Sequence, residues 1–492
     1  MRHNKEEFMR TMKRVAAVAL SVVVLMTSGV SAKAAVTDVQ PAKNSSEAVL
    51  KWAKKVGEPF DEKTYANNTV SKIKLVGNYL YVADDAKHRI MKIDKKDGTI
   101  LKEQKYYDES YIQGYVSSIG YGDGKVYVGY DNGRVQAFDE NTLESVWITD
   151  ENKNAINADF VFTNGKLYFG TTAKTTDWYD NGAPFSYYVV TTSDDDKTKP
   201  DEEKTMKKVV ESKTGKFYLK KGVVLGKYIV ISDTAGTLTM IDTTNDKVTD
   251  TKDIGEAFSG NITYDEMTGT IYFVAGTNDL YGIKVSADGK LKDEKKVRLY
   301  ETGYSATTPE VYNGKVYVSG SKGKAFQDKG YMAVADVSSD KYKVNYTVEL
   351  SNYSQCEPTI VKTGEDSVRV YFTINDEPGG IYAIEDSKDA TSATLETVYE
   401  PTGDIKNTGC MSNVVVDEDG TIYFANDSKY IMSVGKKVED TTKSDAIVVK
   451  PVTKTVKSER SVKLTWKKNK SAKGYVIYAK AGKGKYKKAA TV

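Results

Sequence analysis

Hydrophobic and polar positions along the chain repeat as a short unit. Each unit has a turn glycine, an aliphatic–Tyr–aliphatic segment, a polar turn, and a second alternating segment that often ends in Asp. Clear copies are Gly77–Val82 with Ile90–Asp94, and Gly124–Val128 with Val135–Asp139. Alternation with a period of two between turn residues is typical of antiparallel strands joined by tight turns. The pattern therefore predicts an all-β protein.

The unit occurs eight times along the chain. Its marker tyrosines are Tyr81, Tyr127, Tyr168, Tyr228, Tyr272, Tyr317, Tyr371 and Tyr423, between 41 and 60 residues apart. A period near 45 with several short strands per unit is typical of β-propeller blades, which bury their faces against one another. We predict an eight-bladed β-propeller, with seven blades as the alternative. The longest interval contains a charged insertion, 193–213, which we expect to be a solvated loop.

The two ends of the repeat region are expected to meet in one blade. The segment 48–57 precedes the first unit and has the pattern of a lone strand, whereas the last unit leaves little sequence for a fourth strand. An unpaired sheet edge is a liability that closure removes. We therefore expect residues near 48–56 to complete the last blade.

The best copy of the unit resembles a known family. Residues 124–147, G-K-V-Y-V-G-Y-D-N-G-R-V-Q-A-F-D-E-N-T-L-E-S-V-W, are similar to the PQQ-like repeat. That family includes quinoprotein dehydrogenases and the non-enzymatic lipoprotein propeller of the outer-membrane assembly machinery. The resemblance covers roughly residues 45–435, and it implies a fold more strongly than a function.

The N-terminus has the features of an export signal. Basic residues precede the apolar run 15–26, which is followed by Ala32-Lys33-Ala34. The run is short for a membrane-spanning helix, and the small-residue motif fits a cleavage site. We expect residues 1–34 to be a Sec-type signal peptide, with no transmembrane segment left after cleavage. The mature protein would then be extracellular or associated with the cell wall.

Charge is distributed unevenly along the chain. The formal net charge is +3, but residues 444–492 contribute +12 and residues 35–443 contribute −13. An acidic main domain is a poor nucleic-acid binder, so we expect no nucleic-acid partner. The basic tail fits a solvated Lys-rich surface.

The C-terminal residues 441–492 resemble the first strands of a fibronectin type III domain. The resemblance rests on the segments Ser461–Trp466 and Gly474–Tyr478, and it implies that Trp466 is a core residue. A complete sandwich of this kind needs about 90–100 residues. We therefore expect a partial β-sandwich after a propeller that spans residues 35–440.

The chain lacks the residues that several common catalytic sites require. The chain has 2 histidines, and His88 alone would remain after signal cleavage. It lies in a turn among basic neighbours, which favours a surface role over a catalytic triad or a zinc site. Quinone-dependent relatives use an adjacent Cys-Cys pair and a bound Ca²⁺. No adjacent cysteines occur here, so we expect no PQQ, and the sequence gives no support for calcium.

Two pairs of residues deserve separate expectations. Cys356 and Cys410 precede the marker strands of adjacent units. A disulfide between them is one hypothesis, and two separate buried thiols are the alternative.

Glu310 and Glu357 also stand where a blade begins, near the expected channel mouth. Two carboxyl groups about 5–9 Å apart could serve as acid and base on a sugar. Ordinary polar residues at blade starts explain them equally well.

Aromatic side chains concentrate in the inter-strand loops. The candidate binding residues are Trp178, Tyr179, Tyr187 and Tyr188 in the third unit, and Tyr111 and Tyr115 between the first two units. Aromatic loop tips on a rigid scaffold suit sugar or peptide surfaces. Packing of the loops against the propeller is the alternative.

The sequence thus favours a non-catalytic binding scaffold over an enzyme. We expect it to present one propeller face to a protein, peptide or glycan at the cell envelope. The alternative is a carbohydrate-active or quinone-type enzyme that uses carboxylates in the central channel. Convergent carboxylates or a calcium site in the channel would favour the enzyme.

Overall fold

The structure is a computed structural model, and it describes residues 39–57, 70–107, 112, 118–157, 159–174, 183–195, 198–199, 201–218, 220–323, 329–407, 409–410, 412–437, 453–458, 461–466, 475–479 and 487–492. Contacts divide the chain into two units, 1–437 and 438–492. The expected signal segment lies outside the described residues. No helix among the described residues is long and apolar enough to cross a membrane.

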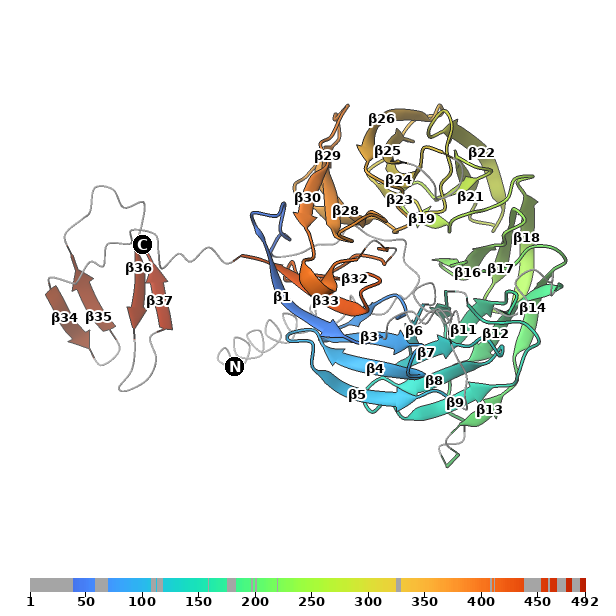
Figure 1. The fold of residues 1–492 in the computed structure, drawn as a ribbon, viewed down its shortest axis with the longest axis horizontal. Helices are drawn as coiled ribbons and strands as arrows, with labels where there is room; N and C mark the ends of the chain where they lie inside the picture. The colour runs from blue at the N-terminus through green and yellow to red at the C-terminus, as the bar shows by residue number, and fades with distance from the viewer. Residues whose placement is uncertain are drawn as a thin grey trace, which may run out of the picture. The chain divides into compact units, whose positions relative to one another are not determined.

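The first unit is an eight-bladed β-propeller, as the repeat predicts (Figure 1). Each blade is a sheet of antiparallel strands in sequence order, from an inner strand at the central channel to an outer strand at the rim. Blades one to four contain β2–β5 (Lys74–Val76, Tyr79–Asp84, Arg89–Asp94, Ile100–Lys105), β6–β9 (Gly120–Gly122, Lys125–Gly129, Val135–Asp139, Ser145–Thr149), β10–β12 with β14 (Val161–Thr163, Lys166–Gly170, Phe185–Thr191, Lys207–Ser212), and β15–β18 (Val223–Leu225, Tyr228–Ser232, Thr237–Asp242, Lys247–Asp253). Blades five to eight contain β19–β22 (Thr263–Asp265, Thr270–Ala275, Asp279–Val285, Leu291–Arg298), β23–β26 (Glu310–Tyr312, Lys315–Ser321, Gly330–Asp336, Lys343–Leu350), β27–β30 (Thr359–Lys362, Ser367–Thr373, Ile381–Ser387, Glu396–Tyr399), and β31–β33 (Val415–Val416, Ile422–Ala425, Tyr430–Lys436) completed by β1 (Ala48–Lys55).

The N-terminal strand closes the ring, which confirms the predicted clasp. β1 pairs antiparallel with β33, from Ala48 opposite Lys436 to Lys55 opposite Tyr430. Trp52 of this strand lies against the turn of blade one, and its Nε1 donates to the Lys95 carbonyl over 3.1 Å. The ring faces the backbone of Gly98, where a Cβ atom would meet it at 2.7 Å. The last blade is therefore joined both to the N-terminus and to blade one.

The marker tyrosines join neighbouring blades. Except for Tyr228, their side chains are buried between sheets, and several hydroxyls donate to the outer turn of the next blade. Tyr81 reaches the Glu140 carbonyl at 2.6 Å, and Tyr423 reaches the Lys95 carbonyl at 3.2 Å. Tyr168 donates to the carboxylate of Asp246 at 2.6 Å. The repeated residue is thus both core and inter-blade hydrogen-bond donor.

One marker position differs from the sequence prediction. In every blade the marker residue of the second strand pairs with the first residue of the inner strand, as Tyr168 pairs with Val161. In blade four that residue is Val230, opposite Val223, and Tyr228 lies two residues earlier. Tyr228 packs instead over Gly289 of blade five, where a Cβ would meet its ring at 2.8 Å. The assignment of Tyr228 was wrong because Tyr228 is the counterpart of Tyr79 in blade one, which also stands two residues before the marker position.

The described part of the charged insertion 193–213 contains two strands, at 202–204 and 207–212, in place of the expected solvated loop. Part of it, β13 (Glu202–Lys204), pairs parallel with β9 and becomes a fifth strand on blade two, and the chain then returns as β14 of blade three. The Lys204 side chain is 6% exposed and its ammonium lies 5.7 Å from the Trp147 ring centroid. It also pairs with Asp195 at 3.1 Å. The insertion therefore satisfies the free edge of β9 and ties two blades together.

The second unit shows two strand pairs among its described residues. These are β34 (Thr453–Ser458) with β35 (Ser461–Thr465), and β36 (Val476–Ala479) with β37 (Lys487–Thr491). Trp466 contacts Tyr475 edge to face, with ring centroids 5.2 Å apart. These pairs do not amount to a fibronectin type III sandwich.

We predict that Trp52→Ala weakens ring closure. Loss of the indole and its hydrogen bond should destabilise the protein by about 2 kcal/mol, less than for a fully buried Trp. The measurement is the urea midpoint of the full chain. Val49→Ala on the same strand is the control, because Val49 is exposed. Equal midpoints for both variants would contradict a role for Trp52 in closure.

Candidate functional site

Loops that lead from one blade to the next gather at one end of the propeller. Strands alternate in direction, so these loops lie at the same end as the turns between second and third strands. Single bridges confirm the juxtaposition: Ala155 pairs with Thr172, Phe258 with Ala275, and Tyr304 with Ser321. We call this end the loop face, and the opposite end the turn face.

A ring of polar residues surrounds the channel near the loop face. Each blade contributes the residue two positions before the one that pairs with the marker position. The members are Lys72, Ser118, Asp159, Lys221, Asn261, Thr308, Glu357 and Asn413. We call this set the lumen ring. Its charged members alternate in sign around the propeller.

The charges of the lumen ring interact across the channel. Lys221 of blade four lies 3.7 Å from the Glu357 carboxylate of blade seven. Lys72 of blade one lies 3.8 Å from Asp159 of blade three. Partners separated by one or more intervening blades can meet only through the lumen. Both distances exceed hydrogen-bonding range, so these are ion pairs without direct hydrogen bonds.

The two candidate carboxyl groups, Glu310 and Glu357, meet in this lumen. Glu310 is the first residue of β23 and is 1% exposed, and its carboxyl group forms a side-chain hydrogen bond with the Glu357 carboxyl group. Burial and the neighbouring Glu357 carboxylate raise the pKa of Glu310 well above its ordinary value. Although burial favours its neutral form, Lys221 and Lys72 hold the pKa of Glu357 below its ordinary value. The pair therefore combines a carboxylic acid with a carboxylate.

The pKa values of the lumen lysines are also shifted in opposite directions. The Glu357 charge raises the pKa of Lys221 despite burial. Burial and the Lys221 charge lower the pKa of Lys74, the first residue of β2. Lys220 points away from this group, and burial lowers its pKa to about 7. Its ammonium donates to the carbonyls of Phe258 at 3.0 Å and Gly260 at 2.6 Å, which joins blade four to blade five.

The aromatic candidates separate into two groups. Tyr111, Tyr115, Trp178 and Tyr179 lie outside the described residues. Tyr187 is 0% exposed and packs on Phe217 with ring centroids 5.3 Å apart, so it is a core residue with no surface to offer a partner. Tyr188 is half-buried, and its hydroxyl accepts a 2.7 Å hydrogen bond from Asn152.

Cys356 and Cys410 are both buried free thiols in the structure. Burial raises the pKa of each, and the Cys356 charge further raises that of Cys410. Both sulfurs interact with the Thr373 hydroxyl, which places them in one small region between blades seven and eight. A disulfide between them stays a prediction.

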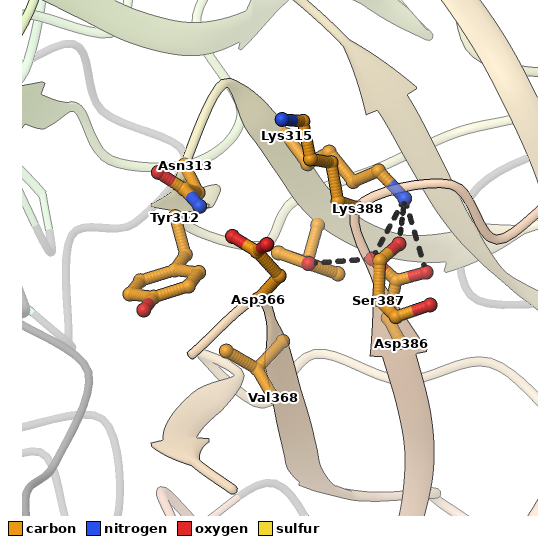
Figure 2. Close-up of a pocket in the computed structure, with 9 residues that line it drawn as sticks. Tyr312, Asn313, Lys315, Asp366, Val368, Asp386, Ser387 and Lys388 are labelled. Atoms are coloured by element: carbon orange, nitrogen blue, oxygen red, sulfur yellow. Dashed lines mark hydrogen bonds and ion pairs between the residues drawn. The ribbon is translucent and has the colours of Figure 1, made fainter. Parts of the chain in front are cut away.

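A pocket between blades six and seven on the turn face is a structural joint (Figure 2). Its cavity volume is about 10 Å³, room for one water molecule. At its wall the buried Lys315 ammonium lies 3.0 Å from Asp386, which also accepts from the Tyr317 and Tyr346 hydroxyls at 2.8 and 2.5 Å. Lys315 further donates to the Ser387 carbonyl at 2.6 Å. This network satisfies its own charges.

The lumen does not fit the metal and cofactor chemistry of quinone-dependent propellers. No group of three or more His, Cys, Asp or Glu in the described part of the chain is arranged to hold a metal ion. The lumen carboxylates Glu357 and Asp159 each face a lysine, whose charge opposes a cation. The two cysteines stand in different blades instead of side by side in the sequence. These residues give no site for calcium with a quinone.

Comparison with solved structures establishes the fold. BamB from Moraxella catarrhalis superposes with a TM-score of 0.53 and 13% identity over 79% of this chain and 99% of that chain. The quinohemoprotein alcohol dehydrogenase ADHIIG from Pseudomonas putida HK5 superposes with a TM-score of 0.55 and 11% identity, over 81% of this chain and 78% of that chain. A europium-containing methanol dehydrogenase superposes with a TM-score of 0.55 and 9% identity, over 78% of this chain and 86% of that chain. No protein-family model matches the sequence, and no curated protein matches it. The propeller of this chain is therefore similar in fold to those of BamB and the quinoprotein dehydrogenases.

We predict that Asp386→Asn destabilises the propeller. The amide leaves the buried Lys315 ammonium without a counter-ion, which should cost about 3 kcal/mol. The urea midpoint measures this loss. Asp366→Asn at the same pocket is the control, since that carboxylate is exposed. A loss in the control as large as that in Asp386→Asn would refute the assignment.

We also predict a pH signature for Glu310. Its folded pKa lies above its unfolded value, so its contribution is complete at acidic pH and is lost as pH rises through the folded pKa. Glu310→Gln keeps a neutral group and removes this dependence. Relative to wild type, the variant should therefore become progressively more stable as the pH rises from 4.5 toward the folded pKa of Glu310. Thermal unfolding over that range tests it, with the exposed Glu301→Gln as control. A pH-independent difference would be contrary to a protonated Glu310.

Proposed function

We propose that this chain is an exported, non-catalytic binding scaffold that presents the loop face of its propeller to a protein, peptide or glycan at the cell envelope. The supporting observation is the state of the lumen charges. Four charged members of the lumen ring form two ion pairs across the channel. Side chains that pair with one another are poorly placed to act on a substrate. We therefore assign binding to the loop face that surrounds the lumen.

The architecture of the loop face supports the same function. Its loops rest on blades fixed by inter-blade hydrogen bonds, such as Tyr317 to Asp386 at 2.8 Å. Loops of variable length on a rigid scaffold are where binding residues gather.

Two further features belong to this proposal. Residues 1–34 supply the Sec-type export signal, which places the mature chain outside the cell or at the cell wall. Residues 441–492 are related in this proposal to a fibronectin type III domain, for which the Trp466–Tyr475 contact is the supporting observation. Such a domain would act as a spacer beside the binding propeller.

A carbohydrate-active enzyme is the second candidate, favoured by one observation. Glu310 and Glu357 lie together with pKa values displaced in opposite directions. Such a split is how acid and base roles are assigned in glycoside hydrolysis. The ion pair of Glu357 with Lys221 weighs against it, because it holds the would-be base in a network.

We predict that a binding partner depends on the loop face. The full chain is immobilised and exposed to envelope extract of its own cells. Charge reversal of the exposed loop-face residues Glu256 and Glu301 should abolish capture of the partner. Reversal of the exposed turn-face residues Glu365 and Glu418 should leave capture unchanged.

The enzyme candidate is tested with the same protein. A panel of glycans is incubated with wild type and with Glu357→Gln. Turnover by wild type that the variant loses, without stable capture of any partner, would overturn the scaffold proposal. Capture without turnover supports it.

A further inference from the structure

Cys356 and Cys410 occupy corresponding places on two neighbouring blades. Cys356 precedes β27 of blade seven and Cys410 precedes β31 of blade eight, so both lie in loops that lead from one blade to the next. Their exposed fractions are 1% and 0%, and both belong to one buried hydrophobic cluster. Both thiols are free in the structure.

The backbone places Cys356 beside Thr373, the last residue of β28. The amide of Asn375 donates to the Tyr353 carbonyl over 2.9 Å, and the chain then pairs antiparallel with β28 as β27. Cys356 lies between these two points of attachment and comes level with Thr373 across the strand pair. Its thiol interacts with the Thr373 hydroxyl.

Cys410 reaches the same threonine from the next blade. The Thr373 hydroxyl donates to the Cys410 carbonyl over 2.8 Å, and the Cys410 amide donates to the Asn375 side chain over 2.9 Å. The Cys410 thiol also interacts with the Thr373 hydroxyl and with the Cys356 thiol. The two sulfur atoms therefore flank one hydroxyl group in the joint between blades seven and eight.

The contacts that hold the two thiols in their present positions are weak. The Cys356 Sγ donates to the Glu357 carbonyl over 3.1 Å, and the Cys410 Sγ donates to the Ala425 carbonyl over 3.6 Å. A thiol is a weak hydrogen-bond donor. The sulfur atoms therefore lose little when they turn from these carbonyls toward each other.

We propose that Cys356 and Cys410 are a redox pair that closes to a disulfide as the exported chain folds, and that this bond fastens blade seven to blade eight. The loop that the bond closes contains all four strands of blade seven. The bond thus secures the joint beside blade eight, which β1 completes. This inference rests on the export part of the proposed function, because disulfides persist in oxidising compartments outside the cytosol.

The oxidant is another disulfide, that of a small thiol or of a thiol oxidoreductase. The thiolate of one cysteine attacks a sulfur atom of the oxidant, forms a mixed disulfide and releases one thiol. The second thiolate attacks the cysteine sulfur of that mixed disulfide, forms the bond between Cys356 and Cys410 and releases the other thiol. Two cysteine thiols are oxidised, the disulfide of the oxidant is reduced, and the two protons end on the released thiols.

Burial determines when this reaction occurs. It raises the pKa of both thiols, so the folded reduced protein contains little of the thiolate that reacts. The pair must therefore be oxidised before blade eight docks on blade seven. Once the bond has formed, the same burial shields it from reductants.

The test is refolding of the full chain from urea with glutathione and glutathione disulfide. Tryptic digestion and mass spectrometry then detect linked peptides that contain Cys356 and Cys410. At least about nine in ten wild-type molecules should carry the link, because a buried structural disulfide resists reduction by glutathione. Folded reduced wild type in the same mixture should be oxidised at least about tenfold more slowly than the refolding chain.

The double variant Cys410→Ser with Ser339→Cys is the matched control. It has the same number of thiols, but Ser339 is exposed in the turn between β25 and β26, on the turn face. No link to Cys356 should form in it. In wild type the link should raise the urea midpoint above that of the reduced protein, because the bond restricts the unfolded chain. The midpoints of Cys356→Ser and Cys410→Ser should not respond to the oxidant.

Three outcomes would overturn the proposal. They are refolded wild type without the link, a link of equal yield in the matched control, and equal urea midpoints for oxidised and reduced wild type. Failure of the scaffold function is a separate result. A link in wild type that captures no partner leaves the disulfide standing, whereas partner capture by wild type that forms no link leaves the scaffold standing.

Discussion

The docking of each blade on the next is the interaction on which the rest of the structure depends. A single four-stranded sheet cannot cover both of its faces, so every blade needs two neighbours. The marker tyrosines supply large buried side chains, and hydroxyls such as those of Tyr81 and Tyr168 find acceptors in the next blade. The first and last blades must therefore also be joined. The pairing of β1 with β33 and the contact of Trp52 with blade one make this joint and complete the ring.

This docking also determines the chemistry of the lumen. The marker position fixes the register of the inner strand, and the residue two positions earlier then stands at the channel in all eight blades. A narrow channel concentrates whatever these positions carry, so isolated charges there would be costly. The alternation of Lys72, Asp159, Lys221 and Glu357 answers this constraint by pairing across the lumen.

Sequence alone predicted the architecture because blades are repeats with local strand patterns. The number of blades and the clasp followed from spacing and alternation. The register of blade four did not follow in this way: Tyr228 stands two positions before Val230, and the tyrosine of the strand pattern was taken for the marker residue. β13 was missed because a charged segment that pairs in parallel with another blade has no local signal. Tyr187 was assigned to a loop, although it is a core residue of β12.

The lumen ring was hidden from sequence reasoning for a related reason. Its members are eight ordinary polar residues scattered over more than 300 positions, and only the strand registers align them. Glu310 and Glu357 were noticed as residues at blade starts, but Lys221 and Lys72, which set their ionisation, were not. The cross-channel pairs are long and contribute little to stability compared with blade docking. Since stability resides in the blade contacts, the lumen residues are free to differ among propellers of the same shape. That separation explains how one fold accommodates BamB, quinone-dependent dehydrogenases and this chain at identities of 9–13%.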